Sequence, residues 1–430
     1  MTAGPVLMLV INPMTADARV DRAAVAIGRT GRAVTVVAVA SEGQPEIEDR
    51  VHYQVIRLPY SRPIKDATTA LRTSLVAARQ RAATTGSWDG GRTQFWRSLL
   101  AYILGGAKLK VRRSSMVWEE YWLSIGSKLP ELLEEPSVIH AHDLGPLFSA
   151  LAISEYWGGR PKVIYDSHEL FTEQQPNWKW IEKKLWKAHE RSVIGCADAV
   201  VTVSDGIARE LKRRYRLSRT PRVVYNSPEV RPIRKGAPDV RSAAGIGMSQ
   251  PLVVYVGHVK EGRGVPTLIA AAEMIPELHI AFVGTEPSLY LQALLPSGPE
   301  NSMLSRIHMI SSVPSETLPE FLRTADLGVH PMERTNMNHE LAMPNKLFDY
   351  VFAGLPVVAS DLQEMGTFVK TWNLGSVFEP GDADGLREAI ETVLAWPNPA
   401  SKETISEISN RFGWKTQAGH LRRLYDELEG

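Results

Sequence analysis

The chain has 430 residues, a formal net charge of +1, and 44% hydrophobic and 23% charged residues. These proportions are typical of a soluble globular protein, and the near-neutral charge argues against a dedicated nucleic-acid binder. A chain of this length exceeds one ordinary hydrophobic core, so we expect two domains. The single cysteine, Cys196, cannot form an internal disulfide, which indicates a reducing compartment. No neighbouring motif would activate its thiol, and we interpret it as a packed structural residue.

No segment has the pattern of a targeting signal or a membrane span. Residues 1–5 lack the basic region that begins a signal peptide. No run approaches the about 18 apolar residues that a transmembrane helix needs. We therefore expect a cytoplasmic protein that is at most peripheral at the inner face of the membrane.

The start of the chain predicts an α/β domain. Residues 6–11 are a continuous apolar run, residues 17–28 have a helical pattern that ends in glycine, and residues 33–40 are a second apolar run. This is a βαβ unit, but its first turn lacks the Gly-x-Gly-x-x-Gly pattern. A dinucleotide site at that turn is therefore not predicted.

Residues 65–135 follow as a long insertion rich in helix formers. Between Gly90 and Trp118 there is no acidic residue, and the six basic ones, interleaved with aromatic and aliphatic residues, are Arg92, Arg97, Lys108, Lys110, Arg112 and Arg113. A stretch of this kind is typical of an interfacial helix on anionic lipid, which predicts a membrane surface or a lipid-linked sugar as a partner. The alternative is a packing helix whose charges are solvated.

Polar residues follow two predicted strands of this half. His140, His142 and Asp143 end one strand, and His168 and Glu169 follow the next. Open α/β sheets bind ligands beyond the carboxyl ends of their strands, so these side chains are candidates for a site. Three ligands this close on one strand cannot all converge on one ion, and we expect no metal here.

A second βα series begins after residues 229–249, which are rich in Pro, Gly, Arg and Lys and which we interpret as an interdomain linker. A basic, glycine-containing loop at residues 257–264 follows its first strand. The predicted strands are residues 252–256, 279–283, 327–329 and 357–359, and a helical tail follows at 414–428. Two βα series of similar size predict two facing doubly wound domains with the site in the cleft between them.

Residues 343–360 have the pattern of a short helix followed by a buried strand. Pro344 suits the first helical turn, and Gly354 is placed for a left-handed stop. The free amides of residues 345–347 would then point out of the helix start. The helix dipole and the charge of Lys346 favour an anion there.

Asp349 would lie one turn deeper on the same helix face, three residues after Lys346 and four after Asn345. A phosphate-attracting helix start with a carboxylate behind it suits a nucleotide, with the diphosphate at the tip and the ribose hydroxyls on the carboxylate. The alternative is a surface unit with a solvated Lys/Asp pair.

Asp382 and Asp384 match the Asp-x-Asp pattern of metal-dependent sugar transferases. They lie between Gly381 and a helical pattern that starts at Leu386, so helix capping explains them better.

Several of these segments together resemble the GT4 family of glycosyltransferases. In chain order they are His140-Ala141-His142-Asp143, Ser204-Asp205-Gly206, Tyr255-Val256-Gly257, Arg263-Gly264, residues 344–350 and residues 353–358. The resemblance covers most of the chain and implies a retaining enzyme of the GT-B fold, an α/β architecture of two facing Rossmann-like domains. It also implies a nucleotide-sugar donor, with no metal or organic cofactor.

The resemblance implies roles for particular residues. Asp349 matches the second acid of the family's Glu-x7-Glu motif, which holds the ribose, and His142 matches the strand-end histidine near the transferred sugar. Arg263 and Lys346 lie where relatives contact the diphosphate, and we expect these two and His142 to be catalytic. The expected donor-binding residues are Gly257, His258, Asn345, Asp349 and Glu340. The expected acceptor-side residues are Asp17, Arg19, His168 and Glu169.

Three departures from the family pattern concern the donor. Asp349 is one methylene shorter than the usual Glu, and His258 stands where many relatives have Arg. Leu341 occupies the position of the first acid, with Glu340 one place away. A backbone irregularity before Pro344 would bring Glu340 into the sugar pocket.

We expect an acceptor-binding domain at residues 1–228, the linker at 229–249, a nucleotide-sugar-binding domain at 250–410, and a C-terminal helix at 411–430 that packs back toward the first domain. The expected reaction moves a hexose-type sugar from a UDP-sugar or GDP-sugar to a hydroxyl of a sugar, a lipid-linked sugar or a small molecule. Cell-surface polysaccharide, glycolipid or metabolite glycosylation would need such an enzyme. The alternatives are a non-catalytic nucleotide-sugar-binding or partner subunit and a sugar-nucleotide 2-epimerase.

Overall fold

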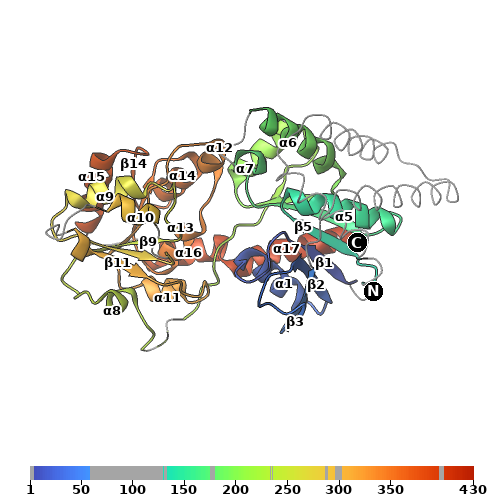
Figure 1. The fold of residues 1–430 in the computed structure, drawn as a ribbon, viewed down its shortest axis with the longest axis horizontal. Coiled ribbons are helices and arrows are strands. Elements are labelled where there is room, and N and C mark those ends of the chain that lie inside the picture. Colours follow the sequence, from blue (N-terminus) through green and yellow to red (C-terminus); the bar gives the residue numbers. More distant parts are fainter. Residues whose placement is uncertain are drawn as a thin grey trace. The chain divides into compact units, whose positions relative to one another are not determined.

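The computed structural model describes residues 4–58, 129, 133–174, 180–232, 234, 236–285, 289–295, 303–396 and 401–430. The basic stretch at residues 92–113 lies outside them, so its lipid contact stays a prediction. The chain divides into two compact units, whose elements are labelled in Figure 1. Unit 1 is Met1–Val203, Ile207–Val224 and Ala418–Gly430, and unit 2 is Ser204–Gly206 and Tyr225–Gln417. Among the described helices, none has the length and apolar character that crossing a bilayer requires.

Unit 1 is built on an eight-stranded sheet of order β3-β4-β2-β1-β5-β6-β7-β8. All neighbours are parallel except β3 and β4, which are antiparallel. The strands are β1 (Val6–Leu9), β2 (Val34–Val39), β3 (Ile47–Arg50), β4 (Tyr53–Leu58), β5 (Val138–His142), β6 (Lys162–Ser167), β7 (Ala199–Thr202) and β8 (Arg222–Val223). The order runs outward in both directions from β1 and β5, so the carboxyl ends of these two strands are the topological switch point.

The helices of unit 1 include the last turns of the chain. They are α1 (Ala18–Gly28), α5 (Leu144–Tyr156), α6 (Trp180–Val193), most of α7 (Asp205–Tyr215) and the later part of α17 (Trp414–Glu429), with short 3-10 turns at Phe171–Glu173 and Ile194–Cys196. The hydroxyl of Tyr425 in α17 lies 2.8 Å from Nδ1 of His140, and Arg32 donates to Asp426 at 3.0 Å. Helix α17, at the end of the chain, is therefore hydrogen-bonded to β5 through Tyr425 and His140.

Unit 2 is built on a six-stranded, fully parallel sheet of order β11-β10-β9-β12-β13-β14. Its switch point lies between β9 and β12. The strands are β9 (Leu252–Val256), β10 (His279–Val283), β11 (Ile307–Ile310), β12 (Leu327–His330), β13 (Val357–Ser360) and β14 (Gly375–Phe378). The helices are α8 (Val240–Ala244), α9 (Val265–Glu273), α10 (Leu289–Leu294), α11 (Leu318–Leu322), α12 (Met337–Leu341), α13 (Asn345–Phe352), α14 (Gln363–Thr371), α15 (Ala383–Leu394) and α16 (Lys402–Phe412), with a 3-10 turn at Leu304–Arg306.

Both faces of the unit 2 sheet are covered, because successive strand residues point to opposite sides. Val254 and Val256 belong to the core that α13 and α14 complete. Val253 and Tyr255 belong to the other core, completed by α9 and α15, which lie side by side in Figure 1. Helices on both faces of a parallel sheet confirm the doubly wound architecture predicted from the sequence.

Several local predictions are confirmed at residue level. The predicted strands 252–256 and 279–283 coincide with β9 and β10. Asp382 caps α15 by accepting from the amide of Gly385, and Gly354 has a left-handed φ of 79°. Strands β3, β4, β11 and β14 were not predicted, and α8 lies inside the segment interpreted as a linker.

Candidate active site

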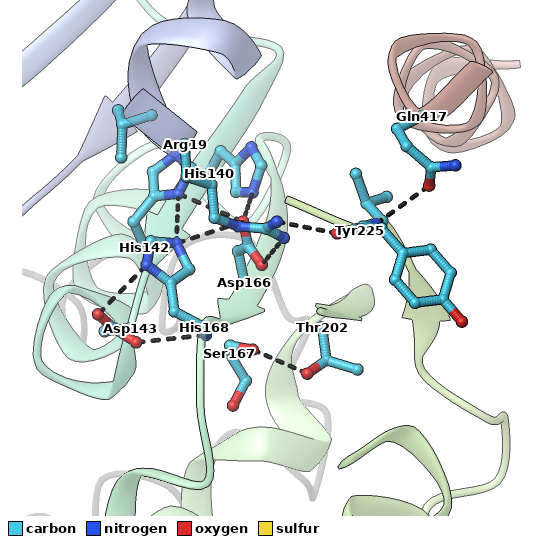
Figure 2. Close-up of polar contacts among 12 residues, drawn as sticks. Arg19, His140, His142, Asp143, Asp166, Ser167, His168, Thr202, Tyr225 and Gln417 are labelled. Carbon is cyan, nitrogen blue, oxygen red and sulfur yellow. Dashed lines mark hydrogen bonds and ion pairs between the residues drawn. The ribbon is translucent and has the colours of Figure 1, made fainter. Parts of the chain in front are cut away.

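The polar residues at the switch point of unit 1 gather around the carboxylate of Asp166 on β6 (Figure 2). Arg19, in the first turn of α1, donates from Nε to Oδ2 at 2.9 Å and from Nη2 to Oδ1 at 2.6 Å. His140 Nε2, His142 Nδ1 and His168 Nε2 lie 3.7, 3.4 and 3.4 Å from Oδ2. The ends of two strands and the start of one helix thus bring four cationic or imidazole groups to one buried carboxylate.

Burial and the neighbouring charges together set the protonation states of the groups in this cluster. Burial opposes the charge of Asp166, but Arg19 and His168 outweigh it and hold the pKa of this carboxyl well below its usual value. Burial lowers the pKa of His140, and burial together with His140 lowers the pKa of His142 to about 3. Burial also opposes protonation of His168, but Asp143 and Asp166 raise its pKa to about 9. At neutral pH, two neutral imidazoles therefore stand beside one imidazolium.

His142 has polar neighbours at Nδ1 but none at Nε2. Nδ1 lies 3.1 Å from Nε2 of His168 and 3.4 Å from Oδ2 of Asp166. Nε2 is buried and has no partner among the described residues. A buried polar atom left unpaired is costly, which is typical of a site completed by a ligand.

The same cluster has the donor atoms of a metal site. Ring nitrogens of His140 and His142 and an oxygen of Asp166 lie within 4.8 Å of one another, which is close enough to hold an ion. From the sequence, we expected that His140, His142 and Asp143 could not converge on one ion; in the structure the third possible ligand is Asp166, from the neighbouring strand. Both oxygens of Asp166 already accept from Arg19, whose positive charge opposes a second cation there.

The remaining acceptor-side candidates lie at the same edge of the sheet. Asp17 caps α1 by accepting from the amides of Arg19 and Val20, and it also accepts from Nδ2 of Asn12 at 2.7 Å. Burial opposes its charge, but His168, the backbone amide of Val20 and His142 outweigh burial and lower the pKa of Asp17. Glu169 follows His168, and its carbonyl oxygen accepts from the Ser167 hydroxyl at 2.7 Å.

In unit 2, the predicted donor residues Gly257 and His258 directly follow β9, one of the two strands at the switch point. Gly257 directly follows β9 with a φ of 110°, and a Cβ added there would lie 2.7 Å from Cε and 3.1 Å from Nζ of Lys346. The Lys346 side chain therefore lies over the end of β9. Arg263 is half-buried just before Gly264, the N-cap of α9, and His258 is exposed.

The other donor-side candidates lie on α12 and α13. Asn345 begins α13, and Asp349 is buried one turn later on it. The carboxylate of Glu340 accepts from Nε of Arg334 at 2.5 Å and from the amide of Gln363 at 3.1 Å. Glu340 is thus held by a guanidinium and a backbone amide at the start of α14.

Two predictions about this helix start are wrong. The amide of Leu347, predicted to be free, donates to the carbonyl oxygen of Pro344 at 3.2 Å. Pro344 is the N-cap of α13, with an extended ψ of 135°, and does not lie in the first helical turn. Its carbonyl is therefore available to the third helical residue, and at most two of the three predicted amides face outward.

His330, at the end of β12, was missed by the sequence reasoning. It is 1% exposed, and neither ring nitrogen has a partner among the described residues. Burial, Lys346 and Arg263 together lower its pKa well below the usual value, so the ring is neutral. The sequence did contain an indication, because His330 is a polar residue at the end of an apolar strand, as His142 is.

Gly264 lies in the turn that leads from β9 into α9. Replacing it tests how much the stability of unit 2 depends on this turn. Gly264 has a φ of 67°, and a Cβ there would lie 1.5 Å from the carbonyl oxygen of Pro331. We expect Gly264→Ala to destabilise unit 2 by at least about 2 kcal/mol, from backbone strain plus the clash. Gly381→Ala is the matched control, because Gly381 has a φ of 86° with nothing within 4 Å. Equal urea-unfolding midpoints for the two variants would show that the close approach to Pro331 does not matter.

Two family models match the chain. The model described as Glycosyltransferase Family 4 matches residues 109–227, and the one described as Glycosyl transferases group 1 matches residues 250–395. TuaC of Bacillus subtilis, named as a glycosyltransferase of teichuronic acid biosynthesis, is 26% identical over 68% of this chain and 71% of its own. A glycogen synthase of Mycobacterium tuberculosis is 24% identical over 67% of this chain and 68% of its own.

Solved structures share the fold. Sucrose-phosphate synthase from Thermosynechococcus elongatus has a TM-score of 0.71 at 17% identity, covering 99% of this chain and 98% of that one. Anabaena Alr3699/HepE in complex with UDP-glucose has a TM-score of 0.63 at 13% identity, covering 99% and 100%. Two doubly wound units of this topology define a GT-B protein. With both family models matching, the chain belongs to the GT4 family of GT-B glycosyltransferases and is a transferase.

Proposed function

We propose that the protein is a retaining, metal-independent hexosyltransferase that uses a nucleotide diphosphate sugar as donor. The observation that carries the proposal is the position of Lys346, whose side chain lies over Gly257 at the end of β9. Arg263 adds a second cation at the start of α9. Positive charge at the switch point of a doubly wound sheet is where such folds hold phosphates. The likeness to a structure holding UDP-glucose agrees with this choice of ligand.

In the proposed reaction, the bond between the sugar C1 and the diphosphate oxygen breaks, and the acceptor oxygen bonds to C1 on the same face. The acceptor proton passes to the departing phosphate oxygen. Lys346 and Arg263 stabilise the charge that develops on the diphosphate. His142 orients the sugar through Nε2, the ring nitrogen that has no partner among the described residues. Asp349 takes the ribose hydroxyls.

Metal independence rests on which charges are already in place. In unit 2, the two cations Lys346 and Arg263 supply the charge that a divalent ion would bring to a diphosphate. In unit 1, Arg19 already neutralises the carboxylate that a metal would need.

The test is a donor panel of UDP- and GDP-sugars with simple sugars and a polyprenyl-linked sugar as acceptors. We expect release of the nucleoside diphosphate, unchanged by EDTA, and a product with the anomeric configuration of the donor by NMR. Activity lost with EDTA and restored by Mg²⁺ would refute metal independence, and an inverted product would refute retention. No release with any donor would refute the proposed function as a whole.

A further inference from the structure

Asp143 has a backbone conformation that only glycine adopts readily. It directly follows β5 and has φ 72° and ψ 173°. In this region a Cβ meets the neighbouring peptide, so a residue other than glycine is strained there. Strain of this kind persists only where the surrounding structure enforces it, and it concentrates at functional sites.

Helix capping does not explain this aspartate. Asp143 is at the N-cap position of α5, where an aspartate ordinarily accepts from an amide of the first turn, but its side chain makes no capping hydrogen bond. Its carboxylate lies toward His168 instead (Figure 2). Oδ1 accepts from the amide of His168 at 3.3 Å, and Oδ2 is 3.5 Å from its Nδ1.

The side chain of Asp143 is also partly exposed to solvent, and its carboxylate has unused hydrogen-bonding capacity. Its side chain is 24% exposed, against 3% for Asp166 in the same cluster. In the part of the chain that the structure describes, His168 is its only hydrogen-bond or ion-pair partner, and both contacts are long. A carboxylate has about four lone-pair sites, so it retains capacity for a ligand. The unpaired Nε2 of His142 lies in the same cluster.

We propose that Asp143, oriented by His168, binds the acceptor by accepting a hydrogen bond from one of its hydroxyls. This inference rests on the proposed transferase function and names a residue that contacts the acceptor. Asp143 lies at the β1/β5 switch point, where an open parallel sheet presents its ligands. A charge-assisted hydrogen bond from a hydroxyl to a carboxylate is short and strong, so one such contact selects strongly for the acceptor. The strained backbone is what aims the carboxylate away from α5 and toward this edge.

The experiment compares Asp143→Gly with Asp143→Ala. Both remove the carboxylate, but only glycine relieves the strain. We expect both variants to lose at least about tenfold in kcat/KM for the acceptor, while donor affinity and slow donor hydrolysis by water stay within about twofold. We expect Asp143→Gly to melt above Asp143→Ala, the reverse of the usual order for these residues.

Glu277→Gly is the matched control, because Glu277 also has a positive φ, of 64°, and is an exposed residue of unit 2. Its acceptor kinetics should equal those of the wild type. Acceptor kcat/KM within about twofold of the wild type in both Asp143 variants would overturn the inference, as would activity that falls only in the less stable one. A loss of donor affinity instead would also overturn it. A wild type that consumes no donor would refute the proposed function, whereas the melting order tests the strain at Asp143 independently of activity.

Discussion

Replacing Lys346 with alanine should lower turnover about 10²-fold or more, the loss expected for one preorganised contact to a developing charge. Nζ of Lys346 lies 3.1 Å from the Cβ position of Gly257, so its charge is held over the carboxyl end of β9 before any donor arrives. The leaving diphosphate gains negative charge as the bond to C1 breaks. We therefore expect kcat to fall more than donor affinity in a purified variant assayed with a saturating donor.

Lys370→Ala is the matched control for this variant. Lys370 is also a lysine of unit 2, but it is paired with Asp361 at 2.7 and 2.8 Å and does not belong to the proposed donor site. Its turnover should equal that of the wild type. Near wild-type turnover for Lys346→Ala, or an equal loss in both variants, would exclude the assigned role of Lys346.

The sequence predicted four of the six strands of unit 2, β9, β10, β12 and β13, because these are short apolar runs with glycine or proline at one end or both, and it missed β11 and β14. β9 and β10 match their predicted limits, and the left-handed φ at Gly354 follows from residue type alone. Strand order was not predictable in this way. The switch points depend on which strand pairs with β1 and with β9, and these pairings join residues far apart in the chain.

The sequence predicted site residues that lie together in one motif, but it did not predict contacts between residues far apart in the chain. Lys346 and Asp349 share one helix, so their spacing alone indicated a common face. The contact of Arg19 with Asp166 joins residues 147 positions apart, and nothing local to either residue specifies it. The orientation of the Asp143 carboxylate away from α5 was equally hidden, since an aspartate before a helix ordinarily caps it.

The second large effect is expected from Asp166→Ala. This change leaves the guanidinium of Arg19, which is 5% exposed, without the carboxylate that it contacts at 2.6 and 2.9 Å. An uncompensated buried charge costs about 3–5 kcal/mol, so we expect a fall of this size in the free energy of unfolding, measured by urea denaturation. Activity should be lost as well, because His142 and His168 lose the carboxylate on which both converge.

The ion pair Arg160–Glu135 is a control that has the same bidentate geometry as Arg19–Asp166 but is exposed to solvent. Its two contacts, both 2.7 Å, are also bidentate, but its side chains are 68% and 37% exposed. The Glu135→Ala variant should therefore have the same free energy of unfolding as the wild type, because water solvates the guanidinium left behind. The double variant Arg19→Met/Asp166→Leu removes both buried charges, so it should be more stable than Asp166→Ala alone and yet inactive. Equal destabilisation by Asp166→Ala and Glu135→Ala would mean that burial of this ion pair is not what holds the histidine cluster together.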